Sequence, residues 1–198
     1  MAAVGGELAL LVVGEAEVDA VPGEIGRQHL AEEGLVLHLL KESDKTMKKW
    51  AEDYNVPYVK EKWLPIVTKA SVIQKEASSV ADMPLVSSVI DNRIKKGMRL
   101  QMDGTLNYGE YSHQKVTARR IRTDTTPYNT YKNRGLPRHP VCNVSREAIG
   151  AALRPKQTDY LYFVGRNDGT HQFSRTLEEH NQAVRKYQRK KLEKNGKG

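Results

Sequence analysis

The sequence lacks the residues and patterns on which several classes of protein depend. Its single cysteine, Cys142, excludes an internal disulfide, and no histidine is spaced with cysteine or acidic residues as a metal site requires. Glycine-rich phosphate loops and the GxSxG context of serine hydrolases are also missing. No apolar run is long enough for a transmembrane helix. The short apolar run at residues 8–13 lacks the preceding basic residue that a signal peptide has. We therefore expect no cofactor and no metal.

The length of 198 residues is enough for one well-buried domain with a small appendage.

The charge of the chain is distributed unevenly. The net charge is +8, but residues 1–64 carry seven Lys and Arg against twelve Asp and Glu, whereas the rest carries 25 against 12. Such a basic region suits nucleic acid, acidic lipid or a carboxylate-bearing cell-wall polymer, and charge alone does not choose among them.

Four regions follow one another along the chain. Residues 1–34 show no sustained period and form an atypical leader, either disordered or with one strand at 8–13. Residues 35–64 are a helical lead-in with an inner face of Leu37, Leu40, Met47 and Trp50, and residues 191–198 are a basic tail. The remaining region, residues 65–190, is the expected functional domain.

The pattern of residues 65–190 predicts a helix-rich α+β domain with a small antiparallel sheet. We expect a helix with Pro65 in its first turn, and a second one that begins after Asp82 and ends at Gly97. Shorter helices follow the caps Thr117 and Ser145, and residues 160–164 and 170–174 form a hairpin around an Asn-Asp-Gly turn. A last helix follows a Thr176 capping box. The expected inner face of the second helix consists of Val86, Val89, Ile90 and Ile94.

Glu76 stands at the border of an apolar helix face. Apolar side chains recur with helical spacing at Ile66, Ala70, Ile73, Ala77 and Val80. A helical Glu76 would contact this surface, which would raise its pKa as a general acid near neutral pH requires. The alternative is a border glutamate whose carboxylate simply reaches water.

Two later segments could present polar groups to a ligand. Residues 98–103 alternate, which predicts an extended segment that presents Gln101 and Asp103 together, and Gly104 marks a turn or a close backbone approach. The irregular stretch 125–143 holds Tyr128, Asn129 and Tyr131, whose side chains can stack on sugar rings and bind hydroxyls. It is either the wall of a polysaccharide cleft or a solvated connector, and Asp103 is either a ligand contact or a turn cap.

His180 falls on the inner face of the last helix, together with Leu177, Val184 and Tyr187. A lone histidine in that position is more typical of packing than of ligand binding.

Several short motifs in this domain match those of one family and follow one another in the same order as in that family. They are ASVIQKEA at residues 70–77, VIDNR at 89–93, GMRLQ at 97–101, YNTY at 128–131, GLP at 135–137 and YLYFV at 160–164. From about residue 65 to residue 187 the sequence resembles the YceG-like endolytic murein transglycosylases. In many members of that family a proline stands where this chain has Gly104.

The resemblance implies a cell-wall enzyme that cuts peptidoglycan glycan strands between N-acetylmuramic acid and N-acetylglucosamine. Glu76 matches the catalytic glutamate, acting first as acid and then as base to form a 1,6-anhydro end. Gln101, Asp103, Tyr128, Asn129 and Tyr131 would bind the substrate. The resemblance also implies peptidoglycan synthases as partners and an inner-membrane anchor with the enzyme facing the periplasm, although no anchor is visible in this sequence.

Two other functions compete with this interpretation. The basic region could bind nucleic acid, in which case affinity would fall linearly with salt on logarithmic axes and survive Glu76→Gln. Alternatively, the chain could be a wall-binding scaffold without activity. The resemblance favours the enzyme, for which no nucleic-acid partner is expected.

Overall fold

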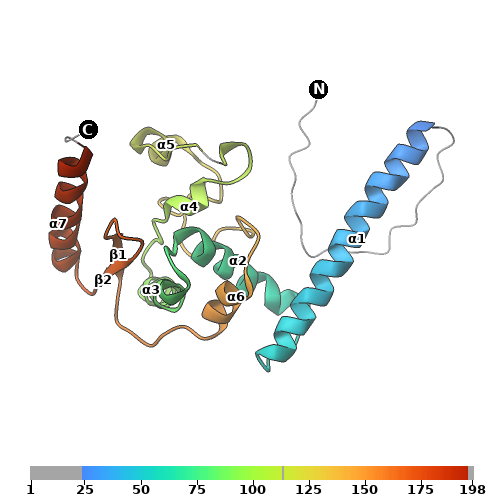
Figure 1. The fold of residues 1–198 in the computed structure, drawn as a ribbon, viewed down its shortest axis with the longest axis horizontal. Coiled ribbons are helices and arrows are strands. Elements are labelled where there is room, and N and C mark those ends of the chain that lie inside the picture. The colour runs from blue at the N-terminus through green and yellow to red at the C-terminus, as the bar shows by residue number, and fades with distance from the viewer. Residues whose placement is uncertain (1–23, 113, 196–198) are drawn as a thin grey trace. The chain divides into compact units, whose positions relative to one another are not determined.

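The computed structural model describes residues 24–112 and 114–195, which fold as two compact units divided near residue 64. It confirms a helix-rich α+β fold with one two-stranded antiparallel sheet in the described residues (Figure 1). The elements are, in order, α1 (Glu24–Asp53), α2 (Lys60–Glu76), η1 (Val80–Asp82), α3 (Met83–Lys95), α4 (Asp103–Leu106), η2 (Gly109–Tyr111), α5 (Ala118–Thr123), α6 (Arg146–Leu153), β1 (Tyr162–Gly165), β2 (His171–Ser174) and α7 (Leu177–Asn195).

In the part of the unit of residues 6–63 that the structure describes, the main element is the long helix α1. It includes residues 24–34, which show no sustained period and were expected to belong to the leader, while the expected strand at 8–13 lies outside the described residues. Met47 is buried as predicted, but Leu37 is 40% exposed, so its inward assignment was wrong. After α1, the Tyr58 hydroxyl donates a 2.7 Å hydrogen bond to Asp44. None of the helices that the structure describes is both long and apolar enough to cross a membrane.

Helix α2 differs from its predicted bounds at both ends. It begins at Lys60, so Pro65 lies inside the helix rather than in its first turn. The missing N–H of Pro65 leaves a carbonyl of the first turn without its helical bond. The helix ends at Glu76, and Val80, predicted to be inward, is 60% exposed in the short turn η1.

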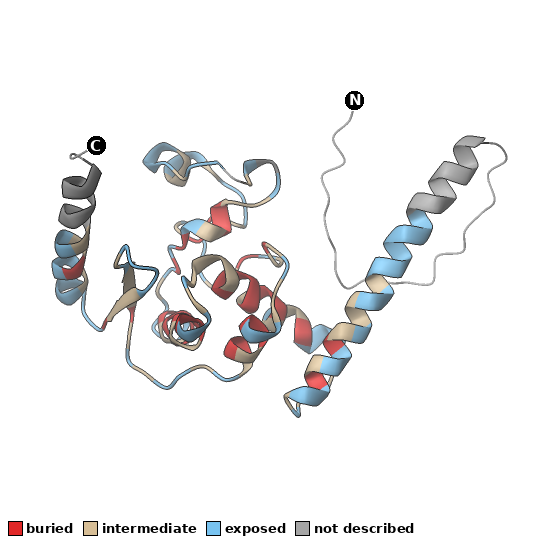
Figure 2. Ribbon diagram, in the orientation of Figure 1, coloured by how far each residue is buried: buried red, intermediate tan, exposed pale blue. Residues whose placement is uncertain are grey.

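The core of the unit of residues 64–198 is formed by apolar side chains of α2, α3 and α6 (Figure 2). Its fully buried members include Val72, Ile73, Val86, Val89, Ile90 and Ile149. Ile94, predicted to be inward, is 41% exposed, whereas Arg93 beside it is buried. The inner face of α3 therefore continues from Ile90 to Arg93, which are three residues apart on the helix.

The predicted caps and the predicted hairpin of the later elements are confirmed, whereas Leu177 at the start of α7, predicted to be inward, is 56% exposed. Thr117 and Ser145 accept hydrogen bonds from the backbone N–H groups of Arg120 and Ala148, as N-caps do. Strands β1 and β2 pair in register, with Phe163 opposite Phe173, and α7 packs against both strands (Figure 1).

The segment before α4 is not a strand, although its alternation is real. Leu100 and Met102 are buried, while Gln101 and Asp103 are exposed. Instead of a strand partner, Thr130 holds this segment: its carbonyl accepts from the Gln101 N–H at 3.1 Å and its hydroxyl accepts from the Met102 N–H at 3.0 Å.

Candidate active site

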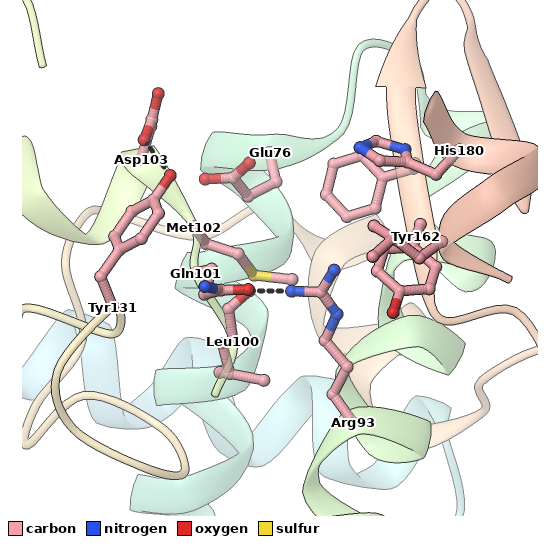
Figure 3. A pocket seen from close by; sticks show the side chains of 11 residues that line it. Glu76, Arg93, Leu100, Gln101, Met102, Asp103, Tyr131, Tyr162 and His180 are labelled. Atoms are coloured by element: carbon pink, nitrogen blue, oxygen red, sulfur yellow. Dashed lines mark hydrogen bonds between the residues drawn. The ribbon is translucent and has the colours of Figure 1, made fainter. Parts of the chain in front are cut away.

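The end of α2 opens into a pocket of about 370 Å³. Its walls come from α2, the segment 100–103, residue 131, strand β1 and the start of α7, with Arg93 of α3 between them (Figure 3). The lining residues are Glu76, Arg93, Leu100, Gln101, Met102, Asp103, Tyr131, Tyr162, Phe163, Leu177 and His180. A pocket of this size, lined by both polar and apolar side chains, can hold a small ligand or a sugar unit of a longer chain.

Glu76 is the last residue of α2 and its carboxylate is directed into the pocket (Figure 3). Burial raises the pKa of Glu76 to about 7, and the nearby Asp103 carboxylate adds to this rise. The Gly104 N–H, Lys75 and Arg93 oppose it by favouring the charged form. Near neutral pH the carboxyl group can therefore both give and accept a proton.

Gly104 makes the close approach that the sequence suggested. Its N–H donates a 2.7 Å hydrogen bond to Glu76 Oε1, which a proline at this position could not do. A Cβ atom on residue 104 would lie 2.7 Å from that same oxygen and 2.7 Å from the Cβ of Lys75. The absence of a side chain thus allows the backbone of α4 to contact the carboxyl group.

Asp103 and Tyr131 form a second polar pair on the pocket wall. The Tyr131 hydroxyl donates a 2.6 Å hydrogen bond to Asp103 Oδ1 (Figure 3). Burial, followed by this bond and the charge of Asp103, raises the pKa of Tyr131 above its usual range, so the hydroxyl keeps its proton. Gln101 lines the same pocket with a φ of 51°, a left-handed conformation that is uncommon for a residue with a side chain.

The other two predicted site residues lie outside the pocket lining. Asn129 is fully buried, and its amide donates to the carbonyls of Ile121 and Asp124 at 2.9 and 2.8 Å. Its side-chain oxygen accepts from the Tyr131 N–H at 3.0 Å, so Asn129 shapes the loop that carries Tyr131. The Tyr128 ring packs against Tyr108, with ring centroids 4.6 Å apart.

Arg93 is a site residue that the sequence interpretation missed. Its Nε donates to the Leu161 carbonyl and its Nη1 to the Leu100 carbonyl, both at 2.6 Å. The guanidinium carbon lies 5.2 Å from the centroid of the Tyr162 ring. Arg93 thereby joins two pocket walls, and the four-plus-three spacing of Val86, Ile90 and Arg93 on one helix face could have revealed its inward position.

His180 was interpreted as a packing residue, and the structure places it in the pocket wall. It stacks on Tyr162 with ring centroids 5.3 Å apart, which agrees with packing. Its Nδ1 is nevertheless buried without a hydrogen-bond partner, and burial, followed by the charge of Arg93, lowers the pKa of its ring. The aromatic residues of β1 were equally hard to assign, because in a four-residue strand both of its faces carry a large side chain.

Among the described residues, no group of three or more His, Cys, Asp or Glu side chains could hold a metal ion. The chemistry that this arrangement supports is proton transfer by a buried carboxyl group, beside a carboxylate and aromatic surfaces.

Comparison with known proteins identifies the family. Residues 26–186 match the YceG-like family. The chain is 44% identical over 130 residues to the endolytic murein transglycosylase of Bacillus subtilis and 32% identical over 133 residues to that of Streptococcus pneumoniae serotype 2. These matches cover 65% and 64% of this chain but only 36% and 24% of the relatives, so the chain spans about a third or less of their length.

A solved structure shows the same fold. The crystal structure of a YceG-like protein from Listeria monocytogenes superposes with a TM-score of 0.66 at 38% sequence identity. The match covers 76% of this chain and 48% of the Listeria chain. Given the family match over most of its length and this shared fold, the chain belongs to the YceG-like family.

Proposed function

We propose that this chain cleaves the glycan strands of peptidoglycan as an endolytic lytic transglycosylase. The observation that carries the proposal is the Glu76 carboxyl group, whose burial in the pocket raises its pKa to about 7. The names of the relatives in Bacillus and Streptococcus support the same substrate.

Glu76 acts twice in the proposed reaction. Its protonated carboxyl group gives a proton to the oxygen that joins N-acetylmuramic acid to N-acetylglucosamine, and the bond from that oxygen to the anomeric carbon breaks. The Glu76 carboxylate then takes the proton of the muramic acid 6-hydroxyl, whose oxygen bonds to the anomeric carbon. The products are a 1,6-anhydro end and a free N-acetylglucosamine hydroxyl, and no water is consumed.

Asp103 supports this reaction without forming a covalent bond. Its carboxylate faces the pocket in which positive charge develops on the sugar ring, so it stabilises the oxocarbenium-like transition state. The Tyr131 hydroxyl fixes the orientation of that carboxylate. Gln101 contributes an exposed amide to sugar hydroxyls from the same wall.

The contributions of Tyr128 and Asn129 are indirect in this proposal. Because the Asn129 amide is buried and bonded to backbone on both sides, it positions Tyr131 rather than touching the sugar. Tyr128 lies on the same irregular loop and packs against Tyr108, outside the pocket lining.

The proposed substrate also sets where the protein acts and with what. Glycan strands lie outside the cytoplasmic membrane, so we place the activity there, at the outer face of the inner membrane in a cell with two membranes. Peptidoglycan synthases, which make the strands, are the proposed protein partners.

The experiment is digestion of purified peptidoglycan followed by mass spectrometry of the soluble fragments. Wild-type protein should release fragments with 1,6-anhydro-muramic acid ends, whereas Glu76→Gln should release none because an amide cannot give the proton. The control is His38→Ala, which changes an exposed residue on α1 and should release the same fragments as the wild type. If the wild type leaves the strands intact, the proposed activity is wrong and the scaffold interpretation is favoured. If the new ends are reducing ends formed with water, the protein is a hydrolase instead.

A further inference from the structure

A chain of three side chains lies just beyond Glu76 and outside the pocket lining. His171 Nδ1 is 3.0 Å from Asp82 Oδ2, and His171 Nε2 is 3.3 Å from Ser78 Oγ. His171 opens strand β2, whereas Ser78 and Asp82 belong to the segment that connects α2 to α3. The contact thus joins parts of the chain that are about ninety residues apart.

Both nitrogens of the ring are used in this contact. The Asp82 carboxylate only accepts hydrogen bonds, so Nδ1 carries a proton and, in the neutral ring, Nε2 accepts from the Ser78 hydroxyl. The side chains of His171 and Asp82 are only 8% and 11% exposed. In the described residues the Asp82 carboxylate has no other hydrogen-bond partner, so losing the ring would leave a buried charge unpaired.

The ring also contacts the pocket wall. Its edge meets the Phe163 ring with centroids 5.2 Å apart and planes at 82°. Phe163 lines the same pocket as Glu76. His171 therefore touches a wall of the pocket on one side and the segment that leaves Glu76 on the other.

The hairpin is consequently tied to α3 at both ends of that helix. At its start, Asp82 binds His171 near the turn of the hairpin. At its end, Arg93 binds the carbonyl of Leu161, the residue before β1. A strand pair of four residues each has little rigidity of its own, so these two attachments, together with the packing of α7, hold its aromatic residues in place.

We propose that His171 is a positioning residue, which with Asp82 and Ser78 fixes the hairpin wall relative to Glu76. This inference rests on the proposed function of Glu76. The arrangement has the connectivity of a serine-hydrolase triad, but Ser78 is exposed and lies outside the pocket. We therefore assign the three residues to geometry and not to nucleophilic attack.

Paired variants separate the two bonds of the ring. In His171→Asn the amide can replace Nδ1 and bind Asp82, while the bond to Ser78 is lost. Ser78→Ala loses that same bond, so the two variants should agree, each with a kcat on soluble glycan strands reduced by about threefold. His171→Gln can replace only Nε2 and leaves Asp82 unpaired, so its kcat should fall on the order of thirtyfold.

A pH profile provides the measurement that a purely structural role would not move. If the segment 77–82 loosens, water reaches Glu76, and the alkaline limb of kcat/KM should shift to lower pH in His171→Gln. The charged and titratable groups around Glu76 are the same in all variants, namely Lys75, Arg93, Asp103, Tyr131, Tyr162 and His180. The control His38→Ala on α1 should keep the wild-type profile.

Each outcome of this experiment decides the inference. Wild-type kcat and pH profile in His171→Gln would overturn it, as would covalent labelling of Ser78 by a fluorophosphonate. If His171→Gln does not fold, disagreement between His171→Asn and Ser78→Ala would overturn it. If the wild type cleaves nothing, the proposed function fails, and hydrogen exchange still decides the inference. Faster exchange of residues 77–82 in His171→Gln than in the wild type supports the contact, and equal exchange overturns it.

Discussion

The carboxyl group of Glu76 links the stability of the protein to pH. Because its pKa is raised to about 7 from an ordinary 4.5, the folded chain holds more protons than the unfolded chain between these values. Stability contributed by this group is therefore fully present below pH 4.5 and is lost as the pH rises through 7. The group that suits acid catalysis thus destabilises the fold at alkaline pH.

Glu76→Gln should remove that cost. We expect the variant to be more stable than the wild type at pH 8 by on the order of 2 kcal/mol, after allowance for solvent screening, and to differ little at pH 4.5. Thermal unfolding of both proteins at the two pH values measures this. A stability difference that does not change with pH would show that Glu76 titrates normally.

The contact between the Gly104 backbone and Glu76 predicts that a side chain added at residue 104 would destabilise the protein. In Gly104→Ala the new Cβ would crowd Glu76 Oε1 and Lys75 Cβ, so we expect a loss of about 1–3 kcal/mol in unfolding free energy and lower activity. Gly34→Ala is the matched control, since Gly34 is also helical but has open space around its Cβ position. Chemical denaturation compares them, and an equally stable, fully active Gly104→Ala would contradict the contact.

Among the elements, the attachment of the β1–β2 hairpin to the rest of the unit depends on Arg93. A lysine at this position has one ammonium group and cannot reproduce the fork that binds the Leu161 and Leu100 carbonyls. We expect Arg93→Lys to reduce the unfolding free energy by about 2–4 kcal/mol, because buried carbonyls lose charged donors. Denaturant unfolding measures the change.

Arg175→Lys is the control for that substitution. Arg175 also lies over a tyrosine ring, Tyr160, and binds Asp159 at 2.7 Å, but both partners of the ion pair are mostly exposed. Its replacement should reduce the unfolding free energy far less than Arg93→Lys does, because water screens an exposed ion pair. If both substitutions reduce the unfolding free energy by similar amounts, the hydrogen bonds of Arg93 to the two carbonyls contribute no stability beyond that of its positive charge.

Local elements were predictable where a few adjacent residues determine them. The Thr117 and Ser145 caps and the hairpin depend on side chains within about four residues, and the structure has all three. The end of α2 was not predictable in this way, because the apolar spacing continues to Val80 although the helix ends at Glu76. Periodicity indicates a helix face but does not determine where the chain leaves it.

Over the whole molecule, the fold class and the position of Glu76 beside apolar surface could be predicted from the sequence, but the composition of the pocket could not. Gln101 and Asp103 could be placed together because alternation is a local property, and the structure puts both in the pocket lining. Arg93 and His180 reach the same pocket from helices almost ninety residues apart, so only tertiary packing reveals them. The chemistry of Asn129 suggests a ligand contact, whereas its amide is bonded to backbone groups of Ile121, Asp124 and Tyr131.

The basic character of the chain also acquires an interpretation at this level. The excess of positive charge lies beyond residue 64, in the unit that contains the pocket. That charge suits a polymer that bears carboxylates, as the peptide stems of peptidoglycan do. The same charge alone would suit nucleic acid, so the pocket and not the charge distinguishes the two functions.

The most direct test of this account is a titration of Glu76 itself. Carboxyl carbon-13 NMR of the protein labelled at glutamate, with Glu76→Gln to assign the signal, reports its pKa in the folded state. If the Glu76 carboxyl group is buried in the pocket, a single resonance that is absent from the variant should titrate near pH 7. A Glu76 resonance that titrates near 4.5, as an exposed glutamate does, would contradict it.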